Sequence, residues 1–553
     1  MRVLQHEWVT AILMFLLLLV PLAIPNPSLH IDEVANWLDR VEGFREAMWS
    51  RDYAATVRTE HPGVTTMALG GIGLTVLNLL SPESGLLDIE TMYAVRTPII
   101  IVNALALTFA FVALRRLVDV RVALLAVVLM AASPILRWYL RLLHIDGMST
   151  TFMFLAFTML MLALHTTTPR EQAATPAPVN WQMLVAAGFV GGLAGLTRFT
   201  AAYLVGMIGV LVLANLFYHR RAFSIRLFVR SAVLPVVVFT AVMAVTWAAL
   251  YPGMWAAPGE VWAETVHGLE NATSAHEEGN YYMGAPVDAP GADFYLWALL
   301  IRLTPVTIIG AGLAVMAAFT GAVRQQWRLW LAVLVYIIVY SVVMTTGAKK
   351  FDRYILPVFP ALHLVAAFGW VWLAGLIGNR VQVPVKAAWA VAIAGIVGYG
   401  LWFYPADYAY TNPMVGSDRA QHILLIAAGG EGMNHVAAEL ERVSGSPKAA
   451  AQYVYTRYGD NLVYNTPQAN IVRLDRMQVD VLGNAYYIVR TISYRQRDPW
   501  TEPVYASAEP LATVDIHGIT YAEIYDAEEI RAFIRANAED GEEWPDPDRE
   551  DED

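Results

Sequence analysis

The sequence contains no cysteine, and only 15% of its 553 residues are charged. Without cysteine the chain can form no disulfide bond, no thiolate metal site and no cysteine nucleophile. The charged fraction is low, because about a quarter of the residues of a soluble domain are Asp, Glu, Lys or Arg. Apolar residues make up 57% of the chain and form runs long enough to cross a bilayer. We therefore predict a polytopic α-helical membrane protein.

The sequence also lacks the motifs that hold nucleotides. No glycine-rich loop with a following Lys-Ser/Thr pair comes after a predicted strand. Gly191, Gly192 and Gly195 lie inside an apolar run, where small residues permit close helix packing. A reaction driven by ATP or a nucleotide sugar is therefore not indicated, and we expect no nucleic-acid partner.

Eleven apolar segments are predicted to cross the plasma membrane, with the N-terminus in the cytoplasm. Lys and Arg concentrate on the cytoplasmic side of membrane proteins. If residues 64–80 also crossed, Arg115 and Arg116 would lie outside, so we predict an interfacial or re-entrant helix there. The predicted spans lie near residues 9–25, 95–114, 122–140, 147–165, 181–197, 199–218, 231–250, 294–320, 329–346, 354–377 and 385–404.

Three parts of the chain are distinguished by composition. Residues 1–404 form the predicted transmembrane domain, which includes the outer loops 26–94 and 252–293. Residues 405–535 are predicted to fold as an extracytoplasmic α/β domain, and the acidic residues 536–553 as a disordered tail. Within that α/β domain we expect a helix at 431–442 and strands in AAQYVYTRY, NAYYIVRTISY and ITYAEIY.

The predicted topology gathers many polar residues at the outer membrane surface. A charge well inside a span costs about 2.5 to 3.5 kcal/mol, so ionisable residues beside spans need an explanation. Snorkelling or pairing among themselves is the plain alternative to a functional role. The candidates are Asp32, Glu33, Glu60, His61, Arg141, His144, Asp146, Arg198, His267, Lys349, Lys350, Asp352 and Arg353. Five of them are expected to line the substrate pocket: His61, Arg141, His144, Asp146 and Arg198.

The segment 347–362 carries three of these cations just before a predicted span. Lys349, Lys350 and Arg353 are predicted to lie on the outer side, where Lys and Arg are uncommon in membrane proteins. On a helix Lys349 and Arg353 would share a face, which suits a phosphate group at headgroup depth. Ordinary anchoring at the membrane surface is the alternative.

Sugar transfer from a lipid phosphate would use such residues. The phosphate leaves without a proton, so no general acid is required, and one carboxylate takes the proton of an acceptor hydroxyl. Asp32 could be this base, with Lys349 and Arg353 stabilising the phosphate. Glu33 is also predicted to be catalytic, but it is the neighbour of Asp32 and points to another side, so we expect a different role for it. A transporter or lipid flippase, and a non-catalytic scaffold with an outer binding domain, are the alternatives.

In order and topology, the motifs over residues 1–404 resemble the C-type (GT-C) membrane glycosyltransferases. The resemblance is to the protein O-mannosyltransferase and aminoarabinose-transferase branch. The motifs are Asp32-Glu33 after the first span, Glu60-His61-Pro62 before residues 64–80, HID at 144–146, GLTRFTA at 195–201 and KKFDRYILP at 349–357.

The resemblance implies transfer of a sugar from a polyprenyl-phosphate donor, with inversion, to a hydroxyl of a protein, lipid or glycan outside the cell. Asp32 matches the catalytic acid of the family, and Lys349 and Arg353 match its lipid-phosphate contacts. Glu60 resembles the metal-binding glutamate of the aminoarabinose branch, with His267 as the candidate partner for a divalent ion. That branch carries a lysine at the position of His61.

Overall fold

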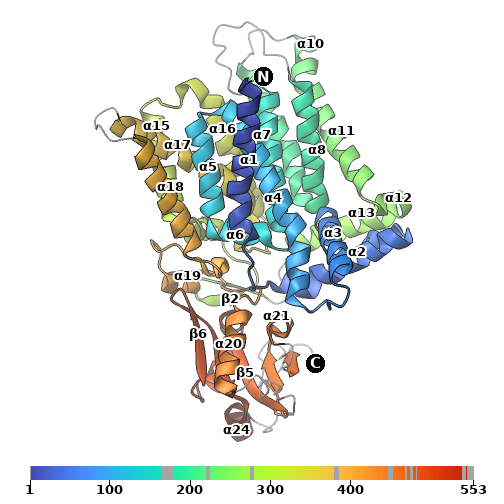
Figure 1. Cartoon of the computed structure of the whole chain (residues 1–553), viewed down its shortest axis with the longest axis vertical. Helices are drawn as coiled ribbons and strands as arrows, with labels where there is room; N and C mark the ends of the chain where they lie inside the picture. The colour runs from blue at the N-terminus through green and yellow to red at the C-terminus, as the bar shows by residue number, and fades with distance from the viewer. Residues whose placement is uncertain are drawn as a thin grey trace.

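The computed structural model describes residues 2–164, 179–218, 224–274, 279–378, 385–445, 453–466, 470–473, 477–480, 482–538 and 544. A bundle of long helices forms one part, and a smaller domain around a β-sheet forms the other (Figure 1). Helix α1 (Arg2–Ala23) begins at the end of the bundle that is far from the sheet. The sheet domain and the N-terminus therefore lie at opposite ends of the molecule.

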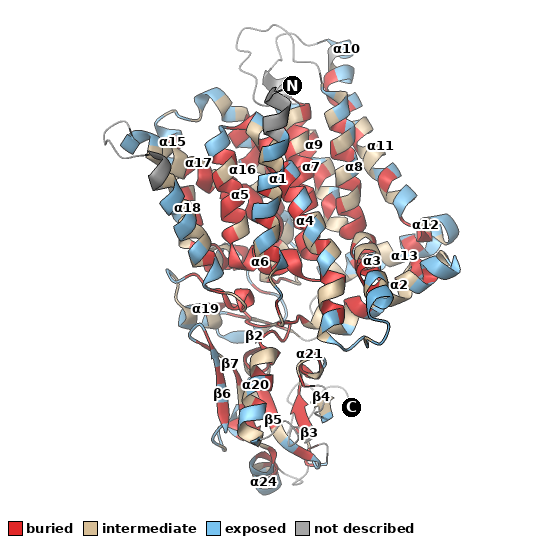
Figure 2. Ribbon diagram, in the orientation of Figure 1, coloured by how far each residue is buried: buried red, intermediate tan, exposed pale blue. Residues whose placement is uncertain are grey.

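The bundle helices are apolar, and Figure 2 shows the most buried ones at its centre. Among the described residues, five helices are long and apolar enough to cross a membrane. Two bent pairs pass the same test, and five further apolar helices are shorter. The total of eleven spans stays a prediction. Besides α1 and the helices described in the next paragraphs, the bundle contains α4 (Ile89–Leu117), α5 (Val120–Ala132), α7 (Ile145–Ala163), α8 (Trp181–Thr197), α9 (Tyr203–Tyr218), α10 (Ile225–Phe228), α11 (Leu234–Leu250), α15 (Pro305–Phe319), α16 (Trp327–Thr345), α17 (Phe359–Gly378) and α18 (Val385–Leu401).

Two predicted spans are each divided into two helices. The segment 122–140 divides into α5 and α6 (Pro134–Arg141), which are bent by 72°. The segment 294–320 divides into α14 (Phe294–Arg302) and α15, which are bent by 114°. Each second helix begins with a proline, which disfavours helical geometry in the residue before it. Helix α6 consequently lies across the sheet-facing end of the bundle (Figure 1).

Helices α2 (Leu38–Ser50) and α3 (Val64–Leu80) lie side by side at the edge of the bundle, near its sheet-facing end (Figure 1). Helix α3 has the bounds predicted for the interfacial helix. A side chain at Gly70 or Gly73 would collide with α2 or with the backbone of α4, so glycine permits this packing. Its outer residues Ile72, Val76, Leu79 and Leu80 are exposed and apolar. Its place at a membrane surface stays a prediction. The segment after α11 contains α12 (Gly253–Ala256), α13 (Pro258–Thr273), β1 (Asn280–Tyr282) and β2 (Ala285–Val287).

The smaller domain contains a five-stranded sheet in the order β4-β3-β5-β7-β6. Strand β3 is parallel to β4 and β5, whereas β7 is antiparallel to β5 and β6. Strands β3, β5 and β7 lie in the three segments predicted as strands; β4 and β6 were not predicted. The bounds are β3 (Tyr453–Thr456), β4 (Asn470–Arg473), β5 (Ala485–Thr491), β6 (Ala512–Ile516), β7 (Ile519–Asp526), α19 (Ser417–Ile423), α20 (Met433–Ser444), α21 (Gly459–Val463), α22 (Ile492–Arg497), α23 (Glu502–Tyr505) and α24 (Ala527–Asn537).

The predicted disordered tail at 536–553 was wrong at its start. Helix α24 continues to Asn537, and the indole of Trp544 packs against Phe533 with ring centroids 5.4 Å apart. The Trp544 Nε1 also donates to the carbonyl of Trp500, at 3.1 Å. The other residues beyond 538 lie outside the described part of the chain.

The sheet domain is fixed to the bundle by buried contacts. Arg137 of α6 donates to both carboxylate oxygens of Asp407, which is fully buried. The rings of Trp138, Tyr408 and Tyr521 form a continuous contact from α6 to β7, with centroids 5.2 and 5.7 Å apart. The predicted domain boundary at 404 therefore lies within a packed junction.

The loop after α1 is held by a buried ion pair with α4. Arg96 donates to the two carboxylate oxygens of Glu33, at 2.7 and 2.5 Å, and to the carbonyls of Asn26 and Ser28, at 2.9 Å each. Glu33 is fully buried and also accepts from the backbone N–H of Leu143, at 2.8 Å. This saturated carboxylate holds the loop in place, which speaks against the catalytic role predicted for Glu33.

The opposite side of the same loop is held by the sheet domain. The backbone N–H of Ile31 donates to the carbonyl of Gly429, at 2.7 Å. The side-chain amide of Asn461 donates to the carbonyls of Leu29 and Gly429, at 3.3 and 2.9 Å. The loop is therefore clamped between the bundle and the sheet domain.

We expect Glu33→Gln to destabilise the protein strongly. The substitution leaves the Arg96 guanidinium buried without its counter-ion, which typically costs about 3–5 kcal/mol. Thermal unfolding in detergent should show a Tm several degrees below that of Glu46→Gln, a matched change at an exposed position of α2. Equal Tm values for the two variants would contradict this account of the ion pair.

Candidate active site

Asp32 occupies the first position of a π-helical turn, η1 (Asp32–Trp37), directly before α2. Such turns are rare and occur often at functional sites. The side chain of Asp32 is 23% exposed, whereas that of Glu33 is fully buried. The two neighbouring acids therefore have different surroundings, as the sequence indicated.

Cationic and imidazole groups from distant segments surround the Asp32 carboxylate. Its Oδ2 lies 3.3 Å from Nη2 of Arg353, 3.2 Å from Nε2 of His144 and 3.5 Å from Nδ1 of His30. Burial alone would raise the pKa of Asp32, but the charge of Arg353 and the hydrogen bond from His144 hold this pKa well below its usual range. Asp32 is therefore ionised at neutral pH.

A second carboxylate, Asp146, lies behind the first and is 2% exposed. Arg198 donates to its Oδ1, and Nε of Arg353 lies 3.7 Å from its Oδ2. The backbone N–H of Asp146 donates to Nδ1 of His144, at 3.2 Å, which leaves the proton of a neutral ring on Nε2, facing Asp32. Burial lowers the pKa of His144 and favours this neutral form. The structure thus brings Asp32, His144, Asp146, Arg198 and Arg353 together.

Further cations lie around His61. Burial, followed by the charges of Arg198, Arg40 and Lys349, lowers the pKa of His61 to about 3. The half-buried Lys349 lies in an irregular segment before the 3-10 helix η7 (Asp352–Val358), which contains Arg353. The predicted shared helical face of Lys349 and Arg353 was therefore wrong. Arg353 and Arg198 share Asp146 as an ion-pair partner, whereas Lys349 contributes to the positive charge around His61.

Two other predicted site residues have different neighbours. Lys350 is 5% exposed, and its Nζ donates to the carbonyl of Pro290, at 2.8 Å. Arg141 is 1% exposed; its Nη2 donates to the carbonyl of Pro21, at 3.0 Å, and lies 3.5 Å from Oδ2 of Asp407. These contacts do not place Lys350 or Arg141 beside Asp32.

The two residues indicated for a metal ion are adjacent. Nδ1 of His267 lies 3.7 Å from Oε2 of Glu60, and His61 lies 3.8 Å from Oε1. Asn271 of α13 donates to the same Oε2. No group of three or more His, Cys, Asp or Glu in the described residues has metal-binding geometry.

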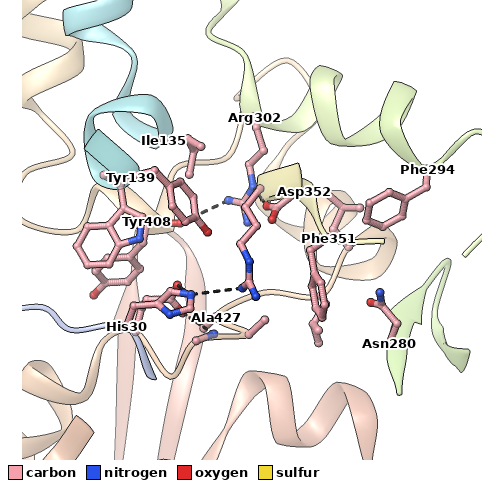
Figure 3. Close-up of a pocket in the computed structure, with 17 residues that line it drawn as sticks. His30, Ile135, Tyr139, Asn280, Phe294, Arg302, Phe351, Asp352, Tyr408 and Ala427 are labelled. Atoms are coloured by element: carbon pink, nitrogen blue, oxygen red, sulfur yellow. Dashed lines mark hydrogen bonds and ion pairs between the residues drawn. The ribbon is translucent and has the colours of Figure 1, made fainter. Parts of the chain in front are cut away.

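A cavity extends from Arg353 to the sheet domain, between α6, α14, η7 and the loop before α20 (Figure 3). Its wall contains Arg302, which donates to Asp352 at 2.6 Å. Glu431 of the sheet domain also lines it, with Oε1 3.7 Å from Nε2 of His30. Burial raises the pKa of Glu431 to about 7. His30 therefore lies between Asp32 and an acid of the sheet domain.

Sequence reasoning missed His30, Arg302 and Glu431 as site residues. The run Gly429-Gly430-Glu431-Gly432 carried a usable signal, because glycines around one acid indicate close backbone approach. A side chain at Gly429 would collide with the ring of His30. Arg302 was hidden inside a segment predicted as one span.

No protein-family model matches the chain, and no curated protein matches it. Among solved structures, the chain is similar to the aminoarabinose transferase ArnT from Cupriavidus metallidurans. The apo form gives a TM-score of 0.47 and 15% identity, over 95% of this chain and 97% of that one. The form bound to undecaprenyl phosphate gives 0.45 and 13%, over 95% and 98%.

A second similar structure is the archaeal oligosaccharyltransferase AglB from Archaeoglobus fulgidus, in complex with an inhibitory peptide and a dolichol-phosphate. The TM-score is 0.46 and the identity 13%, over 92% of this chain and 73% of that one. ArnT and AglB are both GT-C glycosyltransferases, the class that the sequence motifs resemble. Identities this low say nothing about the substrate of this chain.

We expect Glu431 to make stability depend on pH. Its pKa is raised from 4.5 to about 7 in the folded protein, so the folded state binds this proton more tightly than the unfolded state. The resulting stabilisation is complete below the unfolded pKa and is lost as pH rises through 7. The Tm of the wild type should therefore fall relative to that of Glu431→Gln as the pH rises from about 5 to about 8.

His30, whose pKa burial lowers to about 3, stays neutral over this range. The matched control is Glu441→Gln, at an exposed position of α20. A pH-independent difference for Glu431→Gln would show that this carboxyl is not protonated in the folded protein.

Proposed function

We propose that the chain is an integral-membrane glycosyltransferase that moves a sugar from a polyprenyl-phosphate carrier to an acceptor hydroxyl. The observation that carries the proposal is the contact between the accessible Asp32 and Arg353, 3.3 Å apart, within a cluster of cations from distant segments. A carboxylate beside phosphate-binding groups is the arrangement that this reaction requires. The choice of a polyprenyl carrier rests on the resemblance of the sequence motifs.

Asp32 is the base in this proposal. Its carboxylate is ionised and 23% exposed, whereas Asp146 and Glu33 are buried and engaged by arginines. The acceptor hydroxyl gives its proton to Asp32 as its oxygen forms a bond with C1 of the sugar. The bond between C1 and the phosphate oxygen breaks, and the polyprenyl phosphate leaves with the electron pair. Attack from the face opposite the phosphate inverts the configuration at C1.

Arg353, Lys349 and Arg198 bind the phosphate and stabilise the charge that develops on it. The guanidinium of Arg353 also depresses the basicity of Asp32. A phosphate that draws Arg353 toward itself would weaken the Asp32–Arg353 contact and make Asp32 a stronger base. Donor binding and base activation are then one event, which limits proton abstraction to the loaded enzyme.

The remaining parts of the proposal concern location and partners. The site lies at the sheet-facing end of the bundle, which we assign to the extracytoplasmic side of the plasma membrane, with the N-terminus in the cytoplasm. The donor reaches it from the bilayer, and a protein, lipid or glycan supplies the hydroxyl. A transporter would instead carry its charged residues near the middle of the spans.

We expect Asp32→Asn to lower the rate of sugar transfer by about 10²–10⁴-fold, because the amide cannot take the acceptor proton. Membranes containing the full chain are incubated with a polyprenyl-phosphate sugar, and product is measured by mass spectrometry. Asp39→Asn, at a side chain that is 78% exposed in α2, is the matched control and should keep full activity. Unchanged transfer by a well-expressed Asp32→Asn would remove the base from the mechanism.

Arg353→Lys tests the phosphate contact separately. Lysine keeps the charge but loses the planar fork that binds phosphate, so we expect kcat/KM for the lipid donor to fall by about 10–100-fold. Rates measured at varied donor concentration and at varied acceptor concentration should show that the kinetic constants for the donor change. The control is Arg442→Lys, at a side chain that is 65% exposed in α20. A change confined to the KM of the acceptor would contradict the assignment.

A further inference from the structure

A groove separate from the cavity of Figure 3 runs between α1 and α4, at the level where the loop after α1 begins. Its volume is about 320 Å³, at the lower end of the usual range for small-molecule sites. Most of its wall is apolar, and two arginines complete it. The residues that line it are Leu19, Leu22, Ala23, Ile24, Pro25, Asn26, Tyr93, Arg96, Thr97, Ile100, Ile101 and Arg141.

The two arginines differ in how their hydrogen bonds are satisfied. Arg96 is saturated by Glu33, Asn26 and Ser28. Arg141 is 1% exposed, and neither its Nε nor its Nη1 has a hydrogen-bond partner within the described structure. A buried guanidinium with unused donors is costly unless a ligand satisfies it.

The charges around Arg141 do not balance. Asp407 is bound by both nitrogens of the Arg137 fork and lies 3.5 Å from Arg141, so one buried carboxylate faces two arginines. The pair of Arg96 and Glu33 is neutral. One positive charge is therefore left over at the wall of the groove, and an anion bound there would compensate it.

The surroundings of the groove determine the rest of the ligand. On α1, Leu16, Leu17 and Val20 are exposed, and on α4 Ile101 is 38% exposed. A bundle with such an outer surface is in contact with lipid chains. The groove thus offers an apolar path along two helices with an unsatisfied cation in its wall.

We propose that this groove binds a phospholipid of the surrounding bilayer through its anionic phosphate, which contacts Arg141, with an acyl chain along α1 and α4. Arg96 and Asn26, which also line the groove, hold the loop that carries Asp32. A bound phospholipid therefore stabilises that loop without contacting Asp32. The proposal does not depend on sugar transfer.

The test uses the full chain, delipidated in detergent, with dioleoylphosphatidylglycerol as the probe and dioleoylglycerol as the uncharged comparison. Native mass spectrometry measures the apparent Kd, and thermal unfolding measures the gain in Tm. Ile101→Trp fills the groove but leaves Arg141 in place. Val185→Trp, at a 44% exposed position of α8 outside the groove, is the matched control.

We expect dioleoylphosphatidylglycerol to raise the Tm of wild type and of Val185→Trp, and Ile101→Trp to bind it at least about tenfold more weakly. Arg141→Gln, if it folds, should show the same loss. Three results would overturn the proposal: equal binding by Ile101→Trp, equal binding of dioleoylglycerol, or an equal Tm gain from inorganic phosphate alone. Tighter groove binding of undecaprenyl phosphate, abolished in Ile101→Trp, would assign the groove to the carrier lipid and overturn the choice of a bilayer phospholipid.

Discussion

The buried pair of Arg96 and Glu33 is the constraint on which the site depends. It fixes the loop after α1 to α4, and Gly429 and Asn461 hold the other side of that loop. Asp32 comes directly after this loop, at the start of a π-helical turn. Its carboxylate is therefore held in place relative to the bundle. Reactions that transfer a group require such fixed geometry, because small displacements of a base cost large factors in rate.

Around this fixed carboxylate, the fold assembles groups that are far apart in sequence. The breaks before Pro134 and Pro305 turn α6 and α14 across the end of the bundle, where their arginines bind the connector to the sheet domain. The sheet domain in turn brings Glu431 within 3.7 Å of His30. The candidate site thus belongs to both parts of the molecule, and the sheet domain forms part of its wall.

The sequence predicted the apolar helices, three of the five strands and the proximity of Asp32 to Arg353. Hydrophobic run length and charge asymmetry are strong signals, and they located α3. They could not distinguish a straight span from two helices meeting at a proline, so Arg302 stayed hidden. They indicated different roles for Asp32 and Glu33 but not which acid is buried, because the pairing of Glu33 with Arg96 depends on tertiary structure. Lys350 was grouped with Arg353 from the sequence, and only its contact with Pro290 distinguishes it. The contact of Arg141 with Asp407 is likewise visible only in the structure.

The central claim is that a lipid phosphate binds Arg353 and thereby releases Asp32. A cryo-EM structure of the full chain in a lipid nanodisc with undecaprenyl phosphate tests it most directly. The account predicts a phosphate within hydrogen-bond distance of the Arg353 guanidinium and an Asp32–Arg353 separation longer than the present 3.3 Å. A phosphate bound away from Arg353, Lys349 and Arg198, with the Asp32–Arg353 contact intact, would contradict it.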